Sequence, residues 1–406
     1  MGGSRRYPSR WDESHAAALT PLERLCYRSN LLGADRRLAN WGGGNTSVKL
    51  DELDHLNRPV RVLRVKGSGT DLATIGPDGF AALTLDDLAV LRERPALEDA
   101  AMVDHLLRAG LDPGQPRPSI ETLLHAFIPA LCVDHTHPDA IIALTCTPRG
   151  RELAADAFGD EFVWIDWIRP GFALAKLVAE QLQSAPRARF VLLAKHGLVT
   201  WGERDRDCYE TSLEATERAA RVLEPGAAGE PLGPMVRAPL AVDRRRRALA
   251  ALLPVLRGGL SRVRHQVLEV DQGDRVLAFV GAAATPEVSQ VGAACPDHLI
   301  HTKPRPLVLD ATGPGRVRAA LAAYERWYEH YFASHQNEET SAFSIDPPGP
   351  RVVLVPGLGI VTAGADAASA RMANELYQRA IEVTRLAHGN GGFQSLSEAD
   401  AFAVEY

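Results

Sequence analysis

The stretch Cys132-Val133-Asp134-His135-Thr136-His137-Pro138 is the most informative feature of this chain, because it places two histidines two residues apart in an apolar segment. Residues 130–133 and 141–144 are short apolar runs that predict a buried strand. Side chains at positions i and i+2 of a strand point to the same face, so His135 and His137 can close on one metal ion. By itself a His-x-His pair among 13 histidines fits a metal site and a chance pair about equally well.

A third histidine strengthens the metal hypothesis. The apolar run 190–201 predicts a second buried strand, in which His196 stands just before Gly197. Three neutral imidazoles that leave one coordination position open are the ligand set of a catalytic zinc ion rather than a structural one. His135, His137 and His196 are therefore the predicted metal ligands, and the chain is predicted to be a metal-dependent enzyme.

A carboxylate precedes the first histidine pair. Ser119 follows Pro118 and has a typical N-cap side chain, which predicts a helix that begins there and holds Glu121 in its first turn. Glu121 is the predicted proton carrier, since desolvation favours the neutral acid and raises its pKa towards neutrality. The alternative is that Glu121 only interacts with the helix dipole, and the two roles are compatible.

Two polar glycine turns are candidate oxyanion sites. The first covers residues 42–47 and the second covers residues 66–71. Glycine allows positive φ and close backbone approach, so successive N–H groups can converge on a phosphate, and Asn45, Ser68 and Ser119 add side-chain donors. Such turns are common without a ligand. Neither matches a nucleotide-binding motif, so no nucleotide site is predicted.

Composition excludes several classes of protein. The chain has 406 residues, of which 46% are hydrophobic and 24% charged, and a formal net charge of −6, so it lacks a basic field for nucleic acid. No run approaches the ~20 apolar residues of a membrane helix, and the N-terminal segment lacks the apolar core of a secretory signal. Five cysteines without CxxC spacing fit reduced thiols, so we expect a cytoplasmic protein.

Length and a segment rich in Pro and Gly predict two domains. We expect a catalytic domain over residues 1–224, a linker over 225–242, and a degenerate region without metal ligands over 243–406. The run 191–202 can be laid over 353–364 at a constant offset, with Leu358 in the place of His196, which predicts a repeat. Residues 70–72 also resemble residues 296–298, more weakly. The alternative is two strand–turn–helix units that merely look alike.

Together these segments resemble the class II aldolase/adducin family. Five motifs carry the likeness, and their order and spacing over residues 20–225 are highly specific. The resemblance implies an α/β protein with a three-layer α/β/α fold and a central mixed, largely antiparallel sheet, plus a shortened degenerate repeat in the C-terminal half. The motifs are Gly44-Asn45-Thr46-Ser47, Gly67-Ser68-Gly69-Thr70, Ser119-x-Glu121, His135-x-His137-Pro138 and Lys195-His196-Gly197.

Other segments resemble the aldolase half of long bifunctional rhamnulose-1-phosphate aldolase/alcohol dehydrogenases, in which a dehydrogenase module follows. The chain stops at Tyr406, about where that module would begin, so we expect either a stand-alone aldolase unit or part of a longer protein. The matching segments are Tyr27–Arg37, Cys295–His298, Lys303–Leu307 and Pro356–Gly359.

The resemblance also implies roles for the site residues. The three histidines would bind Zn²⁺ or another divalent ion, and Glu121 would take the open ligand position without substrate and then act as acid and base. Small family members often have two serines before this glutamate, whereas Ile120 stands second here. They also complete the site with a tyrosine from a neighbouring subunit, for which residues near Trp167 and Arg169 are the candidates here. The implied phosphate-binding residues are Asn45, Ser68, Gly69 and Ser119.

The implied activity is retro-aldol cleavage of a phosphorylated ketose. L-Rhamnulose 1-phosphate is the favoured substrate, with dihydroxyacetone phosphate and L-lactaldehyde as products. A sugar-phosphate 4-epimerase or decarboxylase would use the same metal site. A non-catalytic adducin-like binding module is a further alternative, although such modules have lost metal ligands that this chain retains. The family implies a homo-oligomer, expected to be a tetramer, with neither nucleic acid nor membrane as a partner.

Overall fold

The computed structural model describes residues 5–338 and 340–406, which fold as two compact units. Unit 1 comprises Met1–Thr145 and Gly150–Val222, and unit 2 comprises Cys146–Arg149 and Leu223–Tyr406. The predicted linker contains Leu232, which is buried among apolar side chains of unit 2. The domain boundaries on either side of that linker stay predictions. Within the described ranges, every helix is too short or too polar to span a bilayer.

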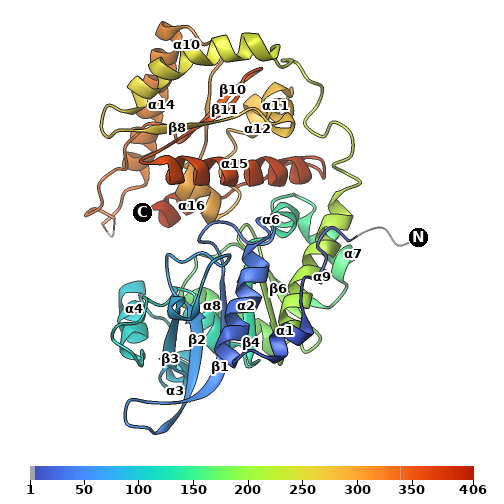
Figure 1. The fold of residues 1–406 in the computed structure, drawn as a ribbon, viewed down its shortest axis with the longest axis vertical. Coiled ribbons are helices and arrows are strands. Elements are labelled where there is room, and N and C mark those ends of the chain that lie inside the picture. Colours follow the sequence, from blue (N-terminus) through green and yellow to red (C-terminus); the bar gives the residue numbers. More distant parts are fainter. Residues whose placement is uncertain (1–4, 339) are drawn as a thin grey trace. The chain divides into compact units, whose positions relative to one another are not determined.

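Unit 1 is built on a seven-stranded sheet with the order β3-β2-β1-β4-β7-β6-β5. Figure 1 labels β1, β2, β3, β4 and β6 of this sheet. Strands β5 and β6 pair in parallel, and the other neighbouring pairs are antiparallel. This is the mixed, largely antiparallel sheet that the resemblance predicted. The strands are β1 (Asn45–Leu53), β2 (Pro59–Lys66), β3 (Phe80–Thr84), β4 (Cys132–Thr136), β5 (Phe162–Ile165), β6 (Phe190–Leu193) and β7 (Gly197–Gly202).

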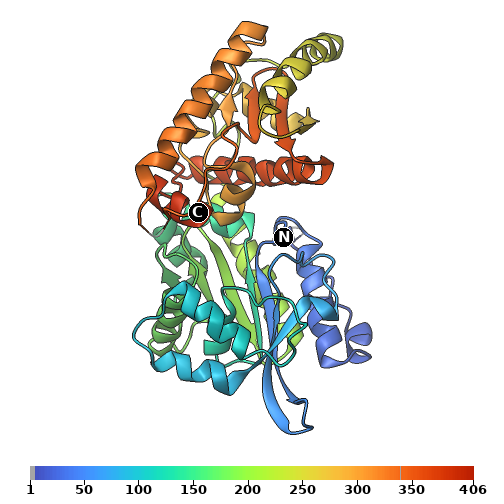
Figure 2. The same ribbon diagram turned by 90° about the vertical axis from the view of Figure 1, so that its left-hand side faces the viewer.

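Helices cover both faces of this sheet (Figure 2). Val133 of β4 packs with apolar side chains of α3, α4, α5 and α8, whereas its neighbour Cys132 packs on the other face with side chains of α2 and α9. The predicted three-layer α/β/α architecture is thus confirmed. The helices are α1 (Glu13–Ala17), α2 (Pro21–Gly33), α3 (Leu85–Ala89), α4 (Asp99–Arg108), α5 (Thr122–Phe127), α6 (Asp139–Thr145), α7 (Gly150–Phe158), α8 (Phe172–Gln183) and α9 (Asp205–Leu223).

Two predicted strands differ from the observed ones. The first was expected to include residues 141–144, but β4 ends at Thr136 and residues 139–145 form α6. Pro138 lacks a backbone N–H for the sheet and is favourable at the start of a helix, which explains the change. The run 190–201 is a hairpin rather than one strand. Its turn contains Lys195 at a φ of 57°, so His196 lies at the tip of a tight turn.

The helix expected to begin at Ser119 begins later. Helix α5 starts at Thr122, and Glu121 occupies its N-cap position. Ser119 is therefore not the N-cap, but its Oγ accepts a hydrogen bond from the N–H of Glu121 at 3.2 Å. The consequence is that Glu121 is held at the very start of α5, where its backbone is not yet helical.

Unit 2 has a four-stranded sheet with the order β8-β11-β10-β9. Strand β9 pairs with β10 in parallel, and the pairs β10–β11 and β11–β8 are antiparallel. Apolar side chains of α10 and α14 pack on one face, and those of α11, α12 and α15 on the other. The elements are α10 (Val242–Leu260), β8 (Val267–Asp271), α11 (Asp274–Gly281), α12 (Thr285–Val288), α13 (Pro296–Thr302), β9 (Leu307–Val308), α14 (Pro314–His335), β10 (Val352–Val355), β11 (Gly359–Gly364), α15 (Ala367–His388) and α16 (Glu398–Glu405).

This second sheet repeats the last four strands of unit 1. The order and directions of β8-β11-β10-β9 match those of β4-β7-β6-β5, and β10, β11 and α15 begin at the same offset from β6, β7 and α9. Gly357, with a φ of 80°, stands where Lys195 stands in the first hairpin. Among the described residues of unit 2, strands β1–β3 have no counterpart, so the repeat is shortened at its start. The weaker likeness of residues 70–72 to 296–298 is wrong, because Pro296 begins a helix between β8 and β9.

Lys49 of β1 gives unit 1 a measurable pH dependence. Its side chain is buried and donates to the carbonyls of Ile128 and Ala130, and burial lowers its pKa from 10.5 to about 8. The unfolded chain therefore binds this proton more tightly, so the free energy of unfolding rises between pH 8 and 10.5 by up to ~3 kcal/mol from this group. Urea unfolding at about pH 7.5 and about pH 10 measures the rise, and Lys49→Met should lose it. An identical pH response in both proteins would contradict the assignment.

Candidate metal centre

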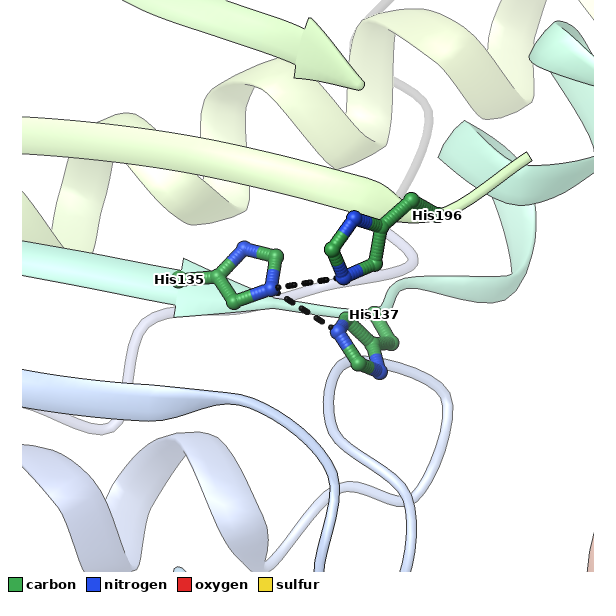
Figure 3. Close-up of side chains that lie close together, drawn as sticks. All are labelled: His135, His137 and His196. Carbon is green, nitrogen blue, oxygen red and sulfur yellow. Dashed lines mark hydrogen bonds between the residues drawn. The ribbon is translucent and has the colours of Figure 1, made fainter. Parts of the chain in front are cut away.

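Three imidazoles converge at one end of β4 (Figure 3). His135 Nε2 lies 2.9 Å from His137 Nε2 and 3.2 Å from His196 Nε2, and one ligand atom from each ring lies within 4.8 Å of the others. All three side chains are buried. Among the described residues, this is the one group of three or more His, Cys, Asp or Glu side chains with metal-ligand spacing. The structure thus brings together the three predicted ligands.

The backbone sets the direction of the central ring. His135 Nδ1 lies 3.0 Å from the carbonyl oxygen of Leu198 in β7. A carbonyl only accepts, so Nδ1 carries the proton and donates it, which leaves the lone pair of Nε2 directed at the other two rings. Such a contact is the usual means of orienting a metal-binding imidazole. The ring of Trp167 stands edge-on to His196, with a centroid distance of 6.2 Å.

Glu121 completes the cluster. Its Oε1 lies 3.3 Å from His135 Nε2 and 3.4 Å from His196 Nε2, and this buried oxygen has no hydrogen-bond donor. Burial favours the neutral acid, but the electrostatic interaction with His135, His196 and His137 outweighs burial, so the pKa of Glu121 lies well below its usual range. The expected rise towards neutrality is therefore wrong for this arrangement, because that expectation considered desolvation without the imidazoles.

These spacings fit a tetrahedral metal ion. Zinc–nitrogen bonds of about 2.0–2.1 Å in a tetrahedron place neighbouring ligand atoms about 3.3–3.4 Å apart. The measured separations between His135 Nε2 and the other three donors are 2.9, 3.2 and 3.3 Å. A buried carboxylate oxygen without a donor, facing three imidazoles, also needs a cation to balance it. The donor set therefore fits one divalent ion.

Asn45 and Ser119 lie beside the carboxylate. Asn45 is the first residue of β1 and pairs with His135 of β4. Its Nδ2 donates to Glu121 Oε2 at 2.8 Å and to Ser119 Oγ at 3.2 Å. The sequence analysis overlooked His125, whose ring contacts Asn45 Oδ1 and lies 2.7 Å from Ser47 Oγ. Its position four residues after Glu121, on the same side of a helix, was the available signal.

The second glycine turn lies next to the segment that leads to Ser119. Ser68 donates its N–H to the carbonyl of Arg117 at 2.8 Å, and Gly69 has a φ of 82° with open space where a side chain would stand. Lys66, a buried residue that the sequence analysis did not single out, reaches the carbonyl of Gly42 in the first turn at 3.1 Å. The two glycine turns are thus joined by a cation, which suits an anionic ligand.

Gly197 permits the close approach of the two histidine strands. A Cβ atom there would lie 2.4 Å from the carbonyl oxygen of Thr136, 2.7 Å from His137 Cδ2 and 3.2 Å from His135 Cε1. None of these atoms belongs to a flexible chain end, so two imidazoles or their backbone would have to shift.

Gly197→Ala should therefore weaken metal binding by roughly 10- to 100-fold, the range seen when the groups that orient metal ligands are disturbed. Competition against a chromophoric chelator measures the dissociation constant. Gly76→Ala is the matched control, because nothing lies within 4 Å of the position of its Cβ. Equal metal affinity in both variants would contradict the tight packing described for Gly197.

The matching positions of unit 2 carry other side chains. Cys132 pairs with Gly202, and at the matching place in the second sheet Val267 pairs with Gly364. By this register, the counterparts of His135, His137 and His196 are Val270, Gln272 and Leu358. Gln272 donates to the carbonyl of Leu358 at 3.0 Å. In unit 2, a hydrogen bond from a side chain to a backbone carbonyl thus lies at the positions that form the imidazole cluster in unit 1.

Comparisons with known proteins match two family models to two successive parts of the chain. Residues 23–223 match the class II aldolase and adducin N-terminal domain, and residues 247–406 match the aldolase class II second domain. An uncharacterized oxidoreductase, YuxG of Bacillus subtilis (strain 168), is 42% identical over 98% of this chain, and the chain spans 58% of that protein.

Solved structures resemble the chain over about half its length. One is the N-terminal class II aldolase domain of a conserved protein from Thermoplasma acidophilum, which is 36% identical with a TM-score of 0.48 and covers 54% of this chain and 99% of its own. Another is an L-fuculose-1-phosphate aldolase from Thermus thermophilus, which is 20% identical with a TM-score of 0.34. It covers 51% of this chain and 98% of its own. With both family models matched in order along the chain, this protein belongs to the class II aldolase/adducin family.

Proposed function

We propose that the chain is a metal-dependent aldolase that cleaves a ketose 1-phosphate, with L-rhamnulose 1-phosphate as the favoured substrate. The observation that carries the proposal is the approach of Glu121 Oε1 to within 3.4 Å of the imidazole nitrogens of His135 and His196. A carboxylate held there can leave the ligand cluster when a substrate arrives and then move a proton. The retained imidazoles also favour an enzyme over a non-catalytic binding module.

His135, His137 and His196 would hold the ion, preferably Zn²⁺. When bound, a divalent ion supplies a Lewis acid that polarises a carbonyl and lowers the cost of the negative charge that develops as the bond breaks. As a carboxylate, Glu121 takes the proton of the C4 hydroxyl while the C3–C4 bond breaks, and it then delivers that proton to C3. The products are dihydroxyacetone phosphate and L-lactaldehyde.

The substrate phosphate is assigned to the glycine turns. The hydroxyls of Ser68 and Ser119 and the N–H of Gly69 would donate to its oxygens, and the ammonium of Lys66 would balance its charge. Asn45 would keep its bond to Glu121 Oε2 and turn the N–H that now meets Ser119 Oγ towards the phosphate. We also propose a homo-oligomer in which a neighbouring subunit completes the site. In longer relatives, a dehydrogenase module would act on the aldehyde product.

Glu121→Gln is the decisive variant. It keeps the size of the side chain but removes the charge and the proton carrier, so we expect kcat to fall by about 10²- to 10⁴-fold, the usual contribution of a general acid or base. Release of dihydroxyacetone phosphate from L-rhamnulose 1-phosphate and L-fuculose 1-phosphate, with metal content measured in parallel, tests this. Glu180→Gln on the exposed side of α8 is the matched control.

Each outcome of that assay has a distinct meaning. Release that depends on Glu121 supports the aldolase and names the sugar. Bound metal without release from either sugar overturns the aldolase proposal in favour of a 4-epimerase or a decarboxylase. Failure to bind any divalent metal, together with no activity when metal is supplied, overturns the enzyme proposal and leaves a binding module.

A further inference from the structure

His125 is a buried imidazole that the proposed chemistry does not use. It lies on α5, four residues after Glu121, and is 0% exposed. Both of its ring nitrogens are engaged: Nδ1 lies 2.7 Å from Ser47 Oγ, and Nε2 contacts Asn45 Oδ1 at close range. Ser47 and Asn45 are both on β1, on the face of the sheet that α5 covers.

The partners fix the tautomer of this ring. Asn45 Nδ2 already donates to Glu121 Oε2 and Ser119 Oγ, so the other end of the amide is its oxygen, which only accepts. His125 Nε2 must therefore carry the proton and donate it. Nδ1 then has a lone pair and accepts the hydroxyl proton of Ser47. The ring is the neutral Nε2–H form, and no donor or acceptor in the chain Ser47–His125–Asn45 is left over.

The carboxylate of Glu121 fixes the direction of the Asn45 amide, because a carboxylate only accepts. If this amide were turned over, its oxygen would face Glu121 Oε2. That contact would be repulsive and would leave a buried polar group unsatisfied at a cost of about 1–3 kcal/mol. His125 in its Nε2–H form holds the amide in the favoured direction through Oδ1.

We propose that His125 is a positioning residue, which holds the amide of Asn45 so that Glu121 is gripped through Oε2 while Oε1 faces the three imidazoles. The expected effect on catalysis rests on the proposed function, whereas the expected effect on the orientation of the Glu121 carboxylate does not. Glu121 has one oxygen bonded to Asn45 at 2.8 Å and the other oxygen without a donor. That asymmetry is what a carboxylate needs if it is to bind and release an ion in one reproducible geometry.

Two variants separate positioning from simple filling of the core. His125→Gln keeps a side-chain N–H near the place of Nε2 and can still donate to Asn45 Oδ1. His125→Phe fills the same volume but has no donor. We expect His125→Phe to lower kcat by about 10- to 100-fold with KM changed less than about threefold, and His125→Gln to retain kcat within about fivefold of the original protein.

Two further measurements do not depend on turnover. The ¹⁵N shifts of the imidazoles in the metal-free protein should show His125 as the Nε2–H tautomer. The visible spectrum of the Co²⁺-loaded protein, which reports the ligands of the ion, should change in His125→Phe and remain in His125→Gln. If no sugar phosphate is cleaved by the original protein, the proposed function fails while these two measurements still test His125.

The proposal is overturned by an Nδ1–H tautomer at His125. It is also overturned by a folded His125→Phe protein whose Co²⁺ spectrum and kcat match those of the original. Should His125→Phe fail to fold, His125→Asn replaces it, because its shorter amide can reach Ser47 but not Asn45. A His125→Asn protein that behaves like His125→Gln would then count against positioning.

Discussion

Alanine in place of His137 or His196 will weaken Zn²⁺ binding by on the order of 10²-fold and remove cleavage activity at micromolar metal. Structural zinc sites with four ligands are worth about 10–16 kcal/mol, so one ligand carries ~3 kcal/mol on average. His137 has the further role of closing the cluster at 2.9 Å from His135. Isothermal titration, or competition with a chelator of known affinity, measures the loss.

The matched control is His55→Ala, in the exposed turn between β1 and β2. It removes an imidazole without touching the cluster and should leave affinity within about twofold. Removal of metal from the original protein should also lower its melting temperature, because a ligand at about 1,000 times its Kd adds ~4 kcal/mol to the free energy of unfolding. Unchanged zinc affinity in both cluster variants would show that these imidazoles do not form the site.

Local sequence patterns were sufficient to single out the three histidines that the structure brings together, but not their surroundings. His135 and His137 are two residues apart, so a strand geometry was enough to bring them together. His196 could be grouped with them only as a hypothesis, because the pairing of β4 with β7 joins residues about sixty apart in sequence. The hairpin turn at Lys195 was missed, since a non-glycine residue at positive φ has no signature in apolar periodicity.

The contacts of Glu121 show the same limit. Its burial was predicted from position, but the direction of its pKa depended on three imidazoles whose distances come from sheet register. The role of His125 was overlooked for a similar reason, although its spacing of four residues from Glu121 is a signal in the sequence. Its partners Asn45 and Ser47 belong to β1, and no short motif indicates that β1 lies against β4. Candidate ligands can be recognised in the sequence by residue type and spacing. Residues that position those ligands can be recognised only when the pairing of distant strands is known.

The repeat in unit 2 clarifies which parts of unit 1 are scaffold. Unit 2 keeps the order and directions of the strands that carry the imidazoles, yet the ligand positions hold Val270, Gln272 and Leu358. It lacks counterparts of β1–β3, which in unit 1 supply Asn45, Ser47 and the glycine turns. The loss of the ligands thus accompanies the loss of the strands that orient the carboxylate. The four-stranded arrangement is therefore present in unit 2 without the imidazoles. In unit 1, strands β1–β3 add the residues that surround the imidazole cluster.

Arg28→Met will destabilise unit 1 by about 3–5 kcal/mol, the largest effect on stability that we expect from a single replacement. Arg28 is 0% exposed and donates to Asp134 Oδ1 at 2.9 Å, Asp205 Oδ1 at 2.5 Å and the carbonyl of Ser47 at 2.6 Å. It ties α2 to β1, β4 and the start of α9. Burial already raises the pKa of Asp134 despite Arg28, so without the guanidinium a buried carboxylate loses its counter-charge.

Chemical denaturation at about pH 7 measures the loss, and two comparisons locate its origin. Arg28→Met combined with Asp134→Leu removes both charges and should recover most of the stability, because a buried pair can often be replaced by apolar side chains at little cost. Arg64→Met breaks the partly exposed pair with Glu52 and should cost no more than about 1 kcal/mol.

Lowering the pH towards about 5 should return part of the stability lost in Arg28→Met, since a protonated Asp134 is neutral and its folded pKa lies above the unfolded value. Equal losses for Arg28→Met and Arg64→Met would mean that the buried network contributes no more than a surface pair.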